Sequence, residues 1–195
     1  MREHVNIVGI GGSMAETSSS LSALEIALRG ARNAGAETQL LDVRSLSLPM
    51  YEPGLGDLPR QIERLNDAVY DADGLIWSSP LYHGTISGSF KNVLDWLNPL
   101  GRREPAYLTN KVVGLISTAG GPQGLQAINT MEFMVRALRG WAVPLVQPIP
   151  RACIVFTDAG EIEDEAIEKQ LLNLGREVAR AAHQFVFHGE CDYAS

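Results

Sequence analysis

Short apolar runs alternate with longer amphipathic stretches along the whole chain. The apolar runs predict β-strands at Val5–Ile10, Thr38–Val43, Gly74–Ser78, Val112–Thr118 and Pro144–Phe156. Helical periodicity predicts helices at Leu21–Asn33, Arg60–Ala72, Ser89–Leu97, Leu125–Leu138 and Glu161–Phe187. The near-continuous Val, Ile and Leu content of the first and fourth strands is typical of strands buried on both faces. This alternation predicts an α/β fold: a doubly wound, five-stranded parallel sheet with helices on both faces.

Two of the predicted helices carry further signals. Acidic residues crowd the expected first turn of the last helix, at Glu161 and Glu163–Glu165, where the helix dipole favours negative charge. In the helix at Ser89–Leu97, Phe90 and Trp96 fall on a different azimuth from Leu94, at ~100° per residue. One of the two sets is therefore expected to face away from the sheet, where large aromatic side chains mark a subunit interface.

Composition narrows the class of protein. A chain of 195 residues with 45% hydrophobic and 20% charged residues suits one globular domain, expected over residues 1–195. The net charge of −7 and the absence of a Lys/Arg cluster argue against nucleic acid as a partner. No apolar run approaches the ~18 residues that a membrane span needs, and the first residues resemble no signal peptide. With Cys153 and Cys191 too far apart for a metal or redox motif, a cytoplasmic protein is expected.

The first predicted strand ends in glycines and is followed by hydroxyl side chains before the first helix. Gly11, Gly12 and Ser13 follow the apolar run, and Thr17–Ser20 are four consecutive hydroxyl residues. Glycines let the backbone approach a ligand, and a helix N-terminus supplies N–H groups suited to phosphate. An ordinary turn with a serine N-cap accounts for part of this pattern. The run of hydroxyl groups exceeds what one cap requires and favours a phosphate site.

Two familiar phosphate motifs fit the first loop poorly. A P-loop needs a Gly-Lys-Ser/Thr sequence, and no Lys lies between Met1 and Ser20. A dinucleotide fingerprint beginning at Gly9 needs a third glycine where the chain has Met14. Asp42, at the end of the second strand, could still act as the ribose-binding acid of such a fold. A nicotinamide-dinucleotide-binding dehydrogenase therefore stays a minor alternative.

Two further loops follow the third and fourth predicted strands. The second loop, Ser78–Gly88, contains Pro80 and Tyr82, and the third, Thr118–Gly124, consists mostly of small residues. Each loop alone could be a plain turn whose tyrosine merely packs, and His83 has no neighbouring carboxylate to orient it as a base. Ligands of doubly wound sheets gather at the carboxyl ends of the strands. Together the three loops therefore suit a ligand with a phosphate at one end and a planar ring at the other, such as flavin mononucleotide (FMN).

The loops and the helix after the second loop resemble the NADPH-dependent FMN reductase family. The resemblance spans roughly Val5 to Pro150, and its Pro-x-Tyr-x-Gly…Lys-Asn-x-x-Asp-Trp block is the specific part. The matching residues are Gly11-Gly12-Ser13, Ser18-Ser19-Ser20, Ser79-Pro80-Leu81-Tyr82-His83-Gly84, Gly88-Ser89-Phe90-Lys91-Asn92-Val93-Leu94-Asp95-Trp96 and Ala119-Gly120-Gly121.

The resemblance implies a flavodoxin-like fold, FMN as cofactor, NADPH or NADH as co-substrate, and a homodimer or homotetramer with the flavin near a subunit interface. It implies phosphate contacts from Ser13, Ser18, Ser19 and Ser20. The ribityl chain and ring would be lined by Pro80, Leu81, Tyr82, His83 and Gly84. The pyrimidine edge would meet Ser117, Ala119, Gly120 and Gly121.

One departure from the family pattern concerns the phosphate. The family's first loop commonly carries an Arg two positions after the Gly-Ser pair, where this chain has Ala15. A bidentate, charge-assisted contact would therefore be missing, and FMN binding is expected to be weaker unless Arg44 or a neighbouring subunit supplies the cation.

The expected function is an NAD(P)H-dependent, FMN-containing oxidoreductase. Hydride would pass through flavin N5 to a small acceptor, either free flavin, a quinone, an azo compound or a metal oxyanion. No side chain is assigned an acid–base role and no metal is expected, because the cofactor carries the redox step. A non-enzymatic electron carrier of the flavodoxin type remains open, since such carriers are also acidic and bind FMN.

Overall fold

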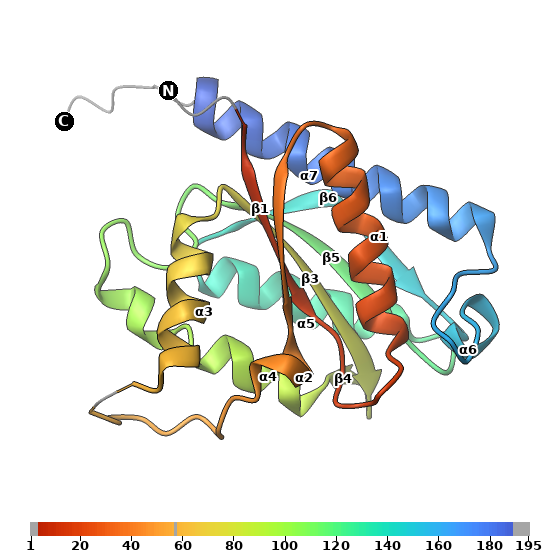
Figure 1. Ribbon diagram of the computed structural model, residues 1–195, viewed down its shortest axis with the longest axis horizontal. Coiled ribbons are helices and arrows are strands. Elements are labelled where there is room, and N and C mark those ends of the chain that lie inside the picture. Colours follow the sequence, from red (N-terminus) through yellow and green to blue (C-terminus); the bar gives the residue numbers. More distant parts are fainter. Residues whose placement is uncertain (1–3, 57, 189–195) are drawn as a thin grey trace.

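The computed structural model describes residues 4–56 and 58–188 and contains a parallel sheet flanked by helices (Figure 1). The parallel strands are β1 (Asn6–Gly11), β2 (Glu37–Asp42), β3 (Gly74–Tyr82), β5 (Val112–Thr118) and β6 (Trp141–Ile149). They lie in the order β2-β1-β3-β5-β6. A two-residue strand, β4 (Thr85–Ile86), pairs antiparallel with the end of β3. The predicted five-stranded parallel sheet is thus confirmed, with one short antiparallel strand added.

Helices cover both faces of the sheet, as predicted. On one face lie α1 (Ser19–Asn33) and α7 (Glu165–His188); on the other lie α3 (Arg60–Asp71), α4 (Gly88–Asp95) and α5 (Gly124–Ala137). Three short elements complete the chain: α2 (Val43–Leu46), the 3-10 helix η1 (Asn98–Arg102) and α6 (Ala152–Val155). Each face buries its own apolar cluster, because the inner strands are apolar at successive positions rather than at alternate ones.

The helices α1 and α7 approach each other backbone to backbone. A Cβ atom on Gly175 would collide with the carbonyl oxygen of Ala27, and one on Gly30 would collide with the carbonyl oxygen of Leu172. Glycine at these two positions therefore allows a helix spacing that no larger residue permits. The contact holds α1, the helix that follows the first loop, close against α7 on the same face of the sheet.

Three predicted element boundaries are wrong. The apolar run at Pro144–Phe156 forms two elements: β6 begins earlier than predicted, at Trp141, and ends at Ile149, and Arg151 adopts a left-handed conformation (φ 49°) before α6. The third strand continues past Ser78 to Tyr82. The last helix begins at Glu165, capped by Asp164, whose Oδ1 accepts the N–H groups of Ala166 and Ile167 at 3.0 and 3.1 Å, so Glu161 and Glu163 precede the helix.

The expected outward-facing aromatic side chains of α4 are buried. Phe90 is 0% exposed and Trp96 is 1% exposed. The segment after α2 covers Trp96, because Trp96 Nε1 donates to the carbonyl oxygen of Pro49 at 2.8 Å. Phe90 instead packs against Trp77 of β3, with 6.0 Å between the ring centroids. Tyr51 packs edge-on against the Trp96 ring, 5.0 Å between centroids. The prediction of an interface at Phe90 and Trp96 is therefore wrong.

Candidate functional site

The three glycine- and hydroxyl-rich loops follow β1, β3 and β5, which are adjacent strands of the sheet. Because parallel strands end at the same edge, the loops meet at one edge of the molecule (Figure 1). The strand order also reverses between β1 and β3, where the chain returns from β2 and crosses to the other half of the sheet. Open α/β sheets bind ligands at such a switch point.

In the first loop, Ser13 and Ser18 bring two hydroxyl groups together. Both residues are buried, and Ser13 Oγ donates to Ser18 Oγ at 3.1 Å. Ser18 is the N-cap of α1, and its Oγ accepts the N–H of Leu21 at 3.3 Å. Among the described residues, no acceptor is found for the hydroxyl proton of Ser18. An anion above this pair could receive that proton without disrupting the cap.

Ser19 and Ser20 open α1 and have different roles. Their backbone N–H groups belong to the first turn, where an α-helix offers no internal acceptor. The Ser20 hydroxyl lies 2.6 Å from Thr118 Oγ1, and the Ser20 carbonyl accepts from Ser78 Oγ at 2.8 Å. Ser20 therefore ties α1 to β5 and β3, so its contribution to a phosphate site would be its backbone N–H rather than its side chain.

The two glycines of the first loop are required by close packing. A Cβ atom on Gly11 would collide with the carbonyl oxygen of Ser78. Gly12 has a φ of 101°, and a Cβ atom there would lie 2.9 Å from Asp42 Oδ1. The Asp42 carboxylate accepts the N–H groups of Arg44 and Ser45, both at 3.1 Å, and so caps α2. Its place beside the loop is thus explained by capping.

The second loop forms a β-hairpin. His83 and Gly84, with φ of 51° and 87°, are the central residues between β3 and β4, as in a tight turn with two left-handed positions. Pro80 is buried and Leu81 half-buried, whereas Tyr82 is 51% exposed at the tip. His83 is exposed as well. The hairpin thus offers an aromatic ring at the edge where a planar ligand could lie.

The third loop is held in place by β6. Ala119 donates its N–H to the carbonyl oxygen of Ile149 at 2.9 Å and accepts the N–H of Ala152 at the same distance. A Cβ atom on Gly120 would meet nothing within 4 Å, so the surface beside this residue is open. Ser117 is 0% exposed, and its Oγ has no hydrogen-bond partner among the described residues. Ser117 is therefore not part of the open surface beside Gly120.

The second and third loops are joined by α5. Thr85 Oγ1 donates to Thr130 Oγ1 at 3.3 Å, and Gln126 Oε1 lies 3.5 Å from the position of a Cβ on Gly84. The hairpin tip therefore packs on the first turns of the helix that follows the third loop. A ring bound at this edge would have the hairpin on one side and the glycines of the third loop on the other.

These features fit FMN. The first loop offers hydroxyl and N–H donors at a helix N-terminus, which suit a terminal phosphate. The third loop offers an open glycine surface and the second a half-exposed tyrosine, which suit a planar ring. The sequence predicted these loops but gave no role to the side chains of Thr118 and Asn92, whose contacts only the folded chain brings about.

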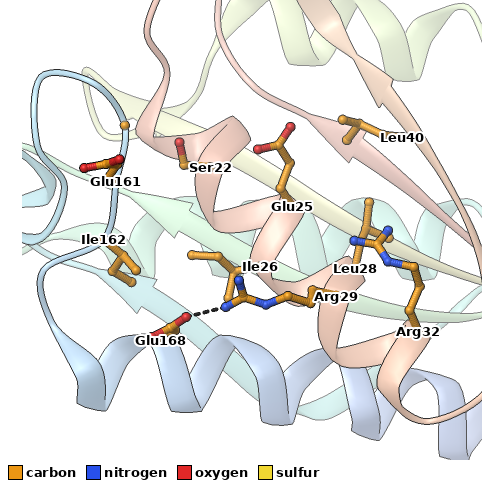
Figure 2. Close-up of a pocket in the computed structure, with 11 residues that line it drawn as sticks. Ser22, Glu25, Ile26, Leu28, Arg29, Arg32, Leu40, Glu161, Ile162 and Glu168 are labelled. Atoms are coloured by element: carbon orange, nitrogen blue, oxygen red, sulfur yellow. Dashed lines mark hydrogen bonds and ion pairs between the residues drawn. The ribbon is translucent and has the colours of Figure 1, made fainter.

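A separate pocket of about 470 Å³ lies on the outer side of α1 (Figure 2). Figure 2 shows Ser22, Glu25 and Arg29 along α1, with Glu161 in the segment that precedes α7 and Glu168 in α7 on the other side of the pocket. Arg29 is paired with Glu168. None of the residues predicted to bind FMN lines this pocket. Within the described residues no cluster suited to a metal ion is found, and no helix is long and apolar enough to cross a membrane.

The fold is flavodoxin-like, and the three loops at one edge of the sheet suit a phosphorylated, planar ligand. Residues 5–149 match the family model for NADPH-dependent FMN reductase. The chain belongs to the NADPH-dependent FMN reductase family, as its motifs predicted. This confirms the expected class, that of flavin oxidoreductases dependent on FMN and NAD(P)H.

Curated relatives agree with this assignment. The chain is 32% identical over 159 residues to the NADPH-dependent FMN reductase ArsH of Acidithiobacillus ferrooxidans, covering 82% of this chain and 65% of the relative. It is 27% identical to ArsH of Shigella flexneri, covering 90% of this chain and 68% of the relative. An FMN-dependent NADPH-azoreductase of Staphylococcus aureus is 36% identical over 47% of this chain and 46% of the relative. The chain thus spans about two thirds of the length of the ArsH relatives.

Solved structures show the same fold at lower identity. FerB of Paracoccus denitrificans, an NAD(P)H:(acceptor) oxidoreductase, superposes with a TM-score of 0.72 at 19% identity, over 93% of this chain and 98% of that one. The apo form of the NADH:FMN oxidoreductase EMOB gives 0.71 at 21% identity, over 91% and 89%. The predicted flavodoxin-like fold is confirmed by these neighbours.

Proposed function

We propose that this protein binds FMN at the edge formed by the three loops and catalyses NAD(P)H-dependent reduction of a small acceptor. The observation that carries the proposal is the meeting of the Ser13–Ser18 hydroxyl pair with the open glycine surface of Gly120 at one edge of the sheet. FMN, when bound, supplies a centre that accepts hydride from NAD(P)H and passes it on.

The chain's own groups bind and orient in this proposal. Ser13, Ser18 and the first-turn N–H groups of α1 bind the phosphate, with the positive end of the helix dipole offsetting its charge. Ala119 and Gly120 lie against the pyrimidine edge of the ring, and Tyr82 borders it from the hairpin. No side chain donates or accepts a proton in the redox step. The acceptor is a small molecule that stacks where the nicotinamide leaves, from the class of flavins, quinones, azo compounds and metal oxyanions.

The test uses the purified chain loaded with FMN under anaerobic conditions. NADPH alone should bleach the flavin absorbance rapidly, and a quinone should restore it with continued NADPH consumption. An electron carrier would bind FMN but stay oxidised without a partner reductase, which would contradict the enzymatic part of the proposal. A chain that binds no FMN would contradict the proposal altogether.

Replacing Tyr82 by Phe tests whether that residue only borders the ring. Tyr82 is 51% exposed, and none of the hydrogen bonds found among the described residues involves its hydroxyl. We expect NADPH consumption with saturating FMN and a quinone to change by no more than about twofold, because no step needs a proton from this group. Tyr82→Ala, which removes the ring, should alter FMN affinity and the flavin spectrum. A folded, flavin-loaded but inactive Tyr82→Phe variant would show that Tyr82 takes part in the chemistry.

We propose a homodimer or homotetramer, with the interface on α5 instead of α4. Phe133 is 73% exposed and Leu125 is 51% exposed on the solvent side of this helix, whose first turns carry the hairpin of the second loop. Large apolar side chains exposed in this way are typical of interfaces. Phe133→Asp should lower the sedimentation coefficient to that of a monomer, whereas Leu40→Asp at the opposite edge of the sheet should not. A native chain that sediments only as a monomer at micromolar concentration would contradict the proposal.

Two expectations complete the proposed function. Residues 1–195 act as one FMN-binding domain, supported by a family match that extends over residues 5–149. The protein works in the cytoplasm, supported by a described Cys153 that is unpaired and by the supply of NAD(P)H there. Cys191 lies outside the described residues.

A further inference from the structure

The first loop has an unfavourable local charge for a phosphate ligand. No Lys or Arg occurs between Glu3 and Leu28, and Glu16 lies in the middle of the loop. In the sequence Glu16 lies between Ser13 and Ser18, the two hydroxyl residues of the proposed phosphate site, and its side chain is 91% exposed. Hydroxyl and N–H donors lower the cost of binding a phosphate there, but none of them carries a full positive charge.

The helix α2 brings a cation from another part of the sequence to this loop. Asp42 lies opposite Gly11 in the parallel pairing of β1 with β2, so the residues after Asp42 begin beside the first loop. Asp42 caps α2, and its Oδ1 lies 2.9 Å from the position of a Cβ on Gly12. The start of α2 is therefore fixed against the loop by the sheet register and by the cap.

Arg44, in α2, reaches the loop with its guanidinium group. Its Nη2 lies 3.5 Å from Glu16 Oε1, and the Arg44 side chain is 43% exposed. This is the cation that the structure pairs with the loop carboxylate. An exposed ion pair of this length contributes little to stability, so the guanidinium can change partners at small cost. A dianionic phosphate accepts two parallel N–H bonds from a guanidinium, which one distant carboxylate oxygen does not.

We propose that Arg44 is the phosphate-binding cation of the FMN site and that Glu16 is its partner when FMN is absent. On binding, the guanidinium moves from the Glu16 carboxylate to the FMN phosphate. This inference rests on the proposed function, because it assigns a residue within the proposed cofactor site.

The test compares FMN with riboflavin, which lacks only the phosphate, by fluorescence titration of the apoprotein at low ionic strength. Arg44→Gln should raise the Kd for FMN about tenfold, as expected for one lost charge-assisted contact. The Kd for riboflavin should stay unchanged. The matched control is Arg103→Gln, because Arg103 is 44% exposed and pairs at 2.6 Å with Asp67 of α3, outside the three loops. It removes the same charge from the protein and should change neither Kd.

Glu16→Gln should act in the opposite direction. It removes the carboxylate that competes for Arg44 and repels the phosphate, so the Kd for FMN should fall several-fold while that for riboflavin stays constant. Both effects should shrink as salt rises. In the Arg44→Gln background the Glu16→Gln gain should be smaller, because the guanidinium that Glu16 competes for is gone.

Ala15→Arg provides the rescue. In the native chain we expect the substitution to lower the Kd for FMN only slightly, because Arg44 already binds the phosphate. In the Arg44→Gln background the same substitution should restore most of the lost affinity for FMN. Equal FMN affinities for Arg44→Gln and Arg103→Gln, in a native chain that binds FMN more tightly than riboflavin, would overturn this inference alone. A native chain that binds neither flavin would overturn the proposed function with it.

Discussion

Replacing Ser13 and Ser18 together by Ala should weaken FMN binding by two orders of magnitude or more. In the proposed complex Ser18 donates its hydroxyl proton to the phosphate, and Ser13 redirects its own from Ser18 Oγ to the phosphate. Each such bond is worth roughly 1.5–3 kcal/mol, or about one to two orders of magnitude in Kd. Both residues are buried in the first loop, and their Oγ atoms lie 3.1 Å apart. The two side chains therefore lose little conformational freedom when the phosphate binds. Titration of the apoprotein with FMN measures the effect.

The structure also shows how to separate this loss from a loss of stability. Ser18 caps α1, so Ser18→Ala alone should cost about 1 kcal/mol of unfolding free energy. Ser13→Ala removes no cap and should affect FMN affinity with less effect on the melting temperature. Ser22→Ala, on the outer side of the same helix, is the matched control and should leave FMN binding unchanged. Unchanged FMN affinity in the double variant would remove this loop from the site.

Gly121→Val should weaken flavin binding about tenfold to a hundredfold, because a branched side chain would occupy the space of the ring edge, at a cost of about 1–3 kcal/mol. The protein itself tolerates the substitution: a Cβ there would lie 2.9 Å from Gln123 Oε1, the end of a flexible side chain. The loss should affect FMN and riboflavin alike, since both carry the ring. This distinguishes it from substitutions in the first loop, which act through the phosphate.

Gly56→Val is the control for this substitution. A Cβ atom on Gly56, like one on Gly120, would meet nothing within 4 Å, and Gly56 lies in the segment that precedes α3. The substitution should leave the Kd for both flavins and the melting temperature unchanged. If Gly121→Val binds FMN as tightly as Gly56→Val does, the third loop does not contact the ring.

The sequence predicted the layers of the fold well because burial leaves a local signature. The apolar runs at Val5–Ile10 and Val112–Thr118 lie within one residue of β1 and β5, the strands with helices on both sides. It failed at Pro144–Phe156, where apolar residues continue through two elements. The break at Arg151 depends on backbone bonds to another loop, from Arg151 N–H to Gly121 O at 3.4 Å and from Ala152 N–H to Ala119 O at 2.9 Å. Such long-range bonds have no signal in the local pattern.

The error at α4 has a similar cause. The helical azimuth separates Phe90 and Trp96 from Leu94, but it does not show what packs against each of them. The segment that covers Trp96, around Pro49 and Tyr51, lies more than thirty residues earlier in the chain and is held by Asn92 and Trp96. The Lys-Asn-x-x-Asp-Trp motif, which identified the family, thus has a structural role at these two positions.

The candidate site could also be predicted from the sequence only in part. The glycine and hydroxyl content of the loops is local, so the first loop and Gly120 could be identified from the chain alone. The local sequence does not show which partner each hydroxyl group contacts. The Ser20 hydroxyl bonds to Thr118, 98 positions away, and Ser117 is buried. Arg44 lies beside Glu16 only because β2 pairs with β1 in one particular register.

The backbone contact between α1 and α7 determines which parts of the site can move. Gly30 and Gly175 let the backbones of the two helices touch, so α1 has no free space into which it could move on the side of α7. In the proposed site the N-terminal end of α1 is therefore held in place, and we expect adjustment to ligands of different shape to come from the hairpin and the third loop. We therefore expect the sequences of those two loops to determine which acceptors fit, whereas the phosphate end of the proposed site should be the same for every acceptor.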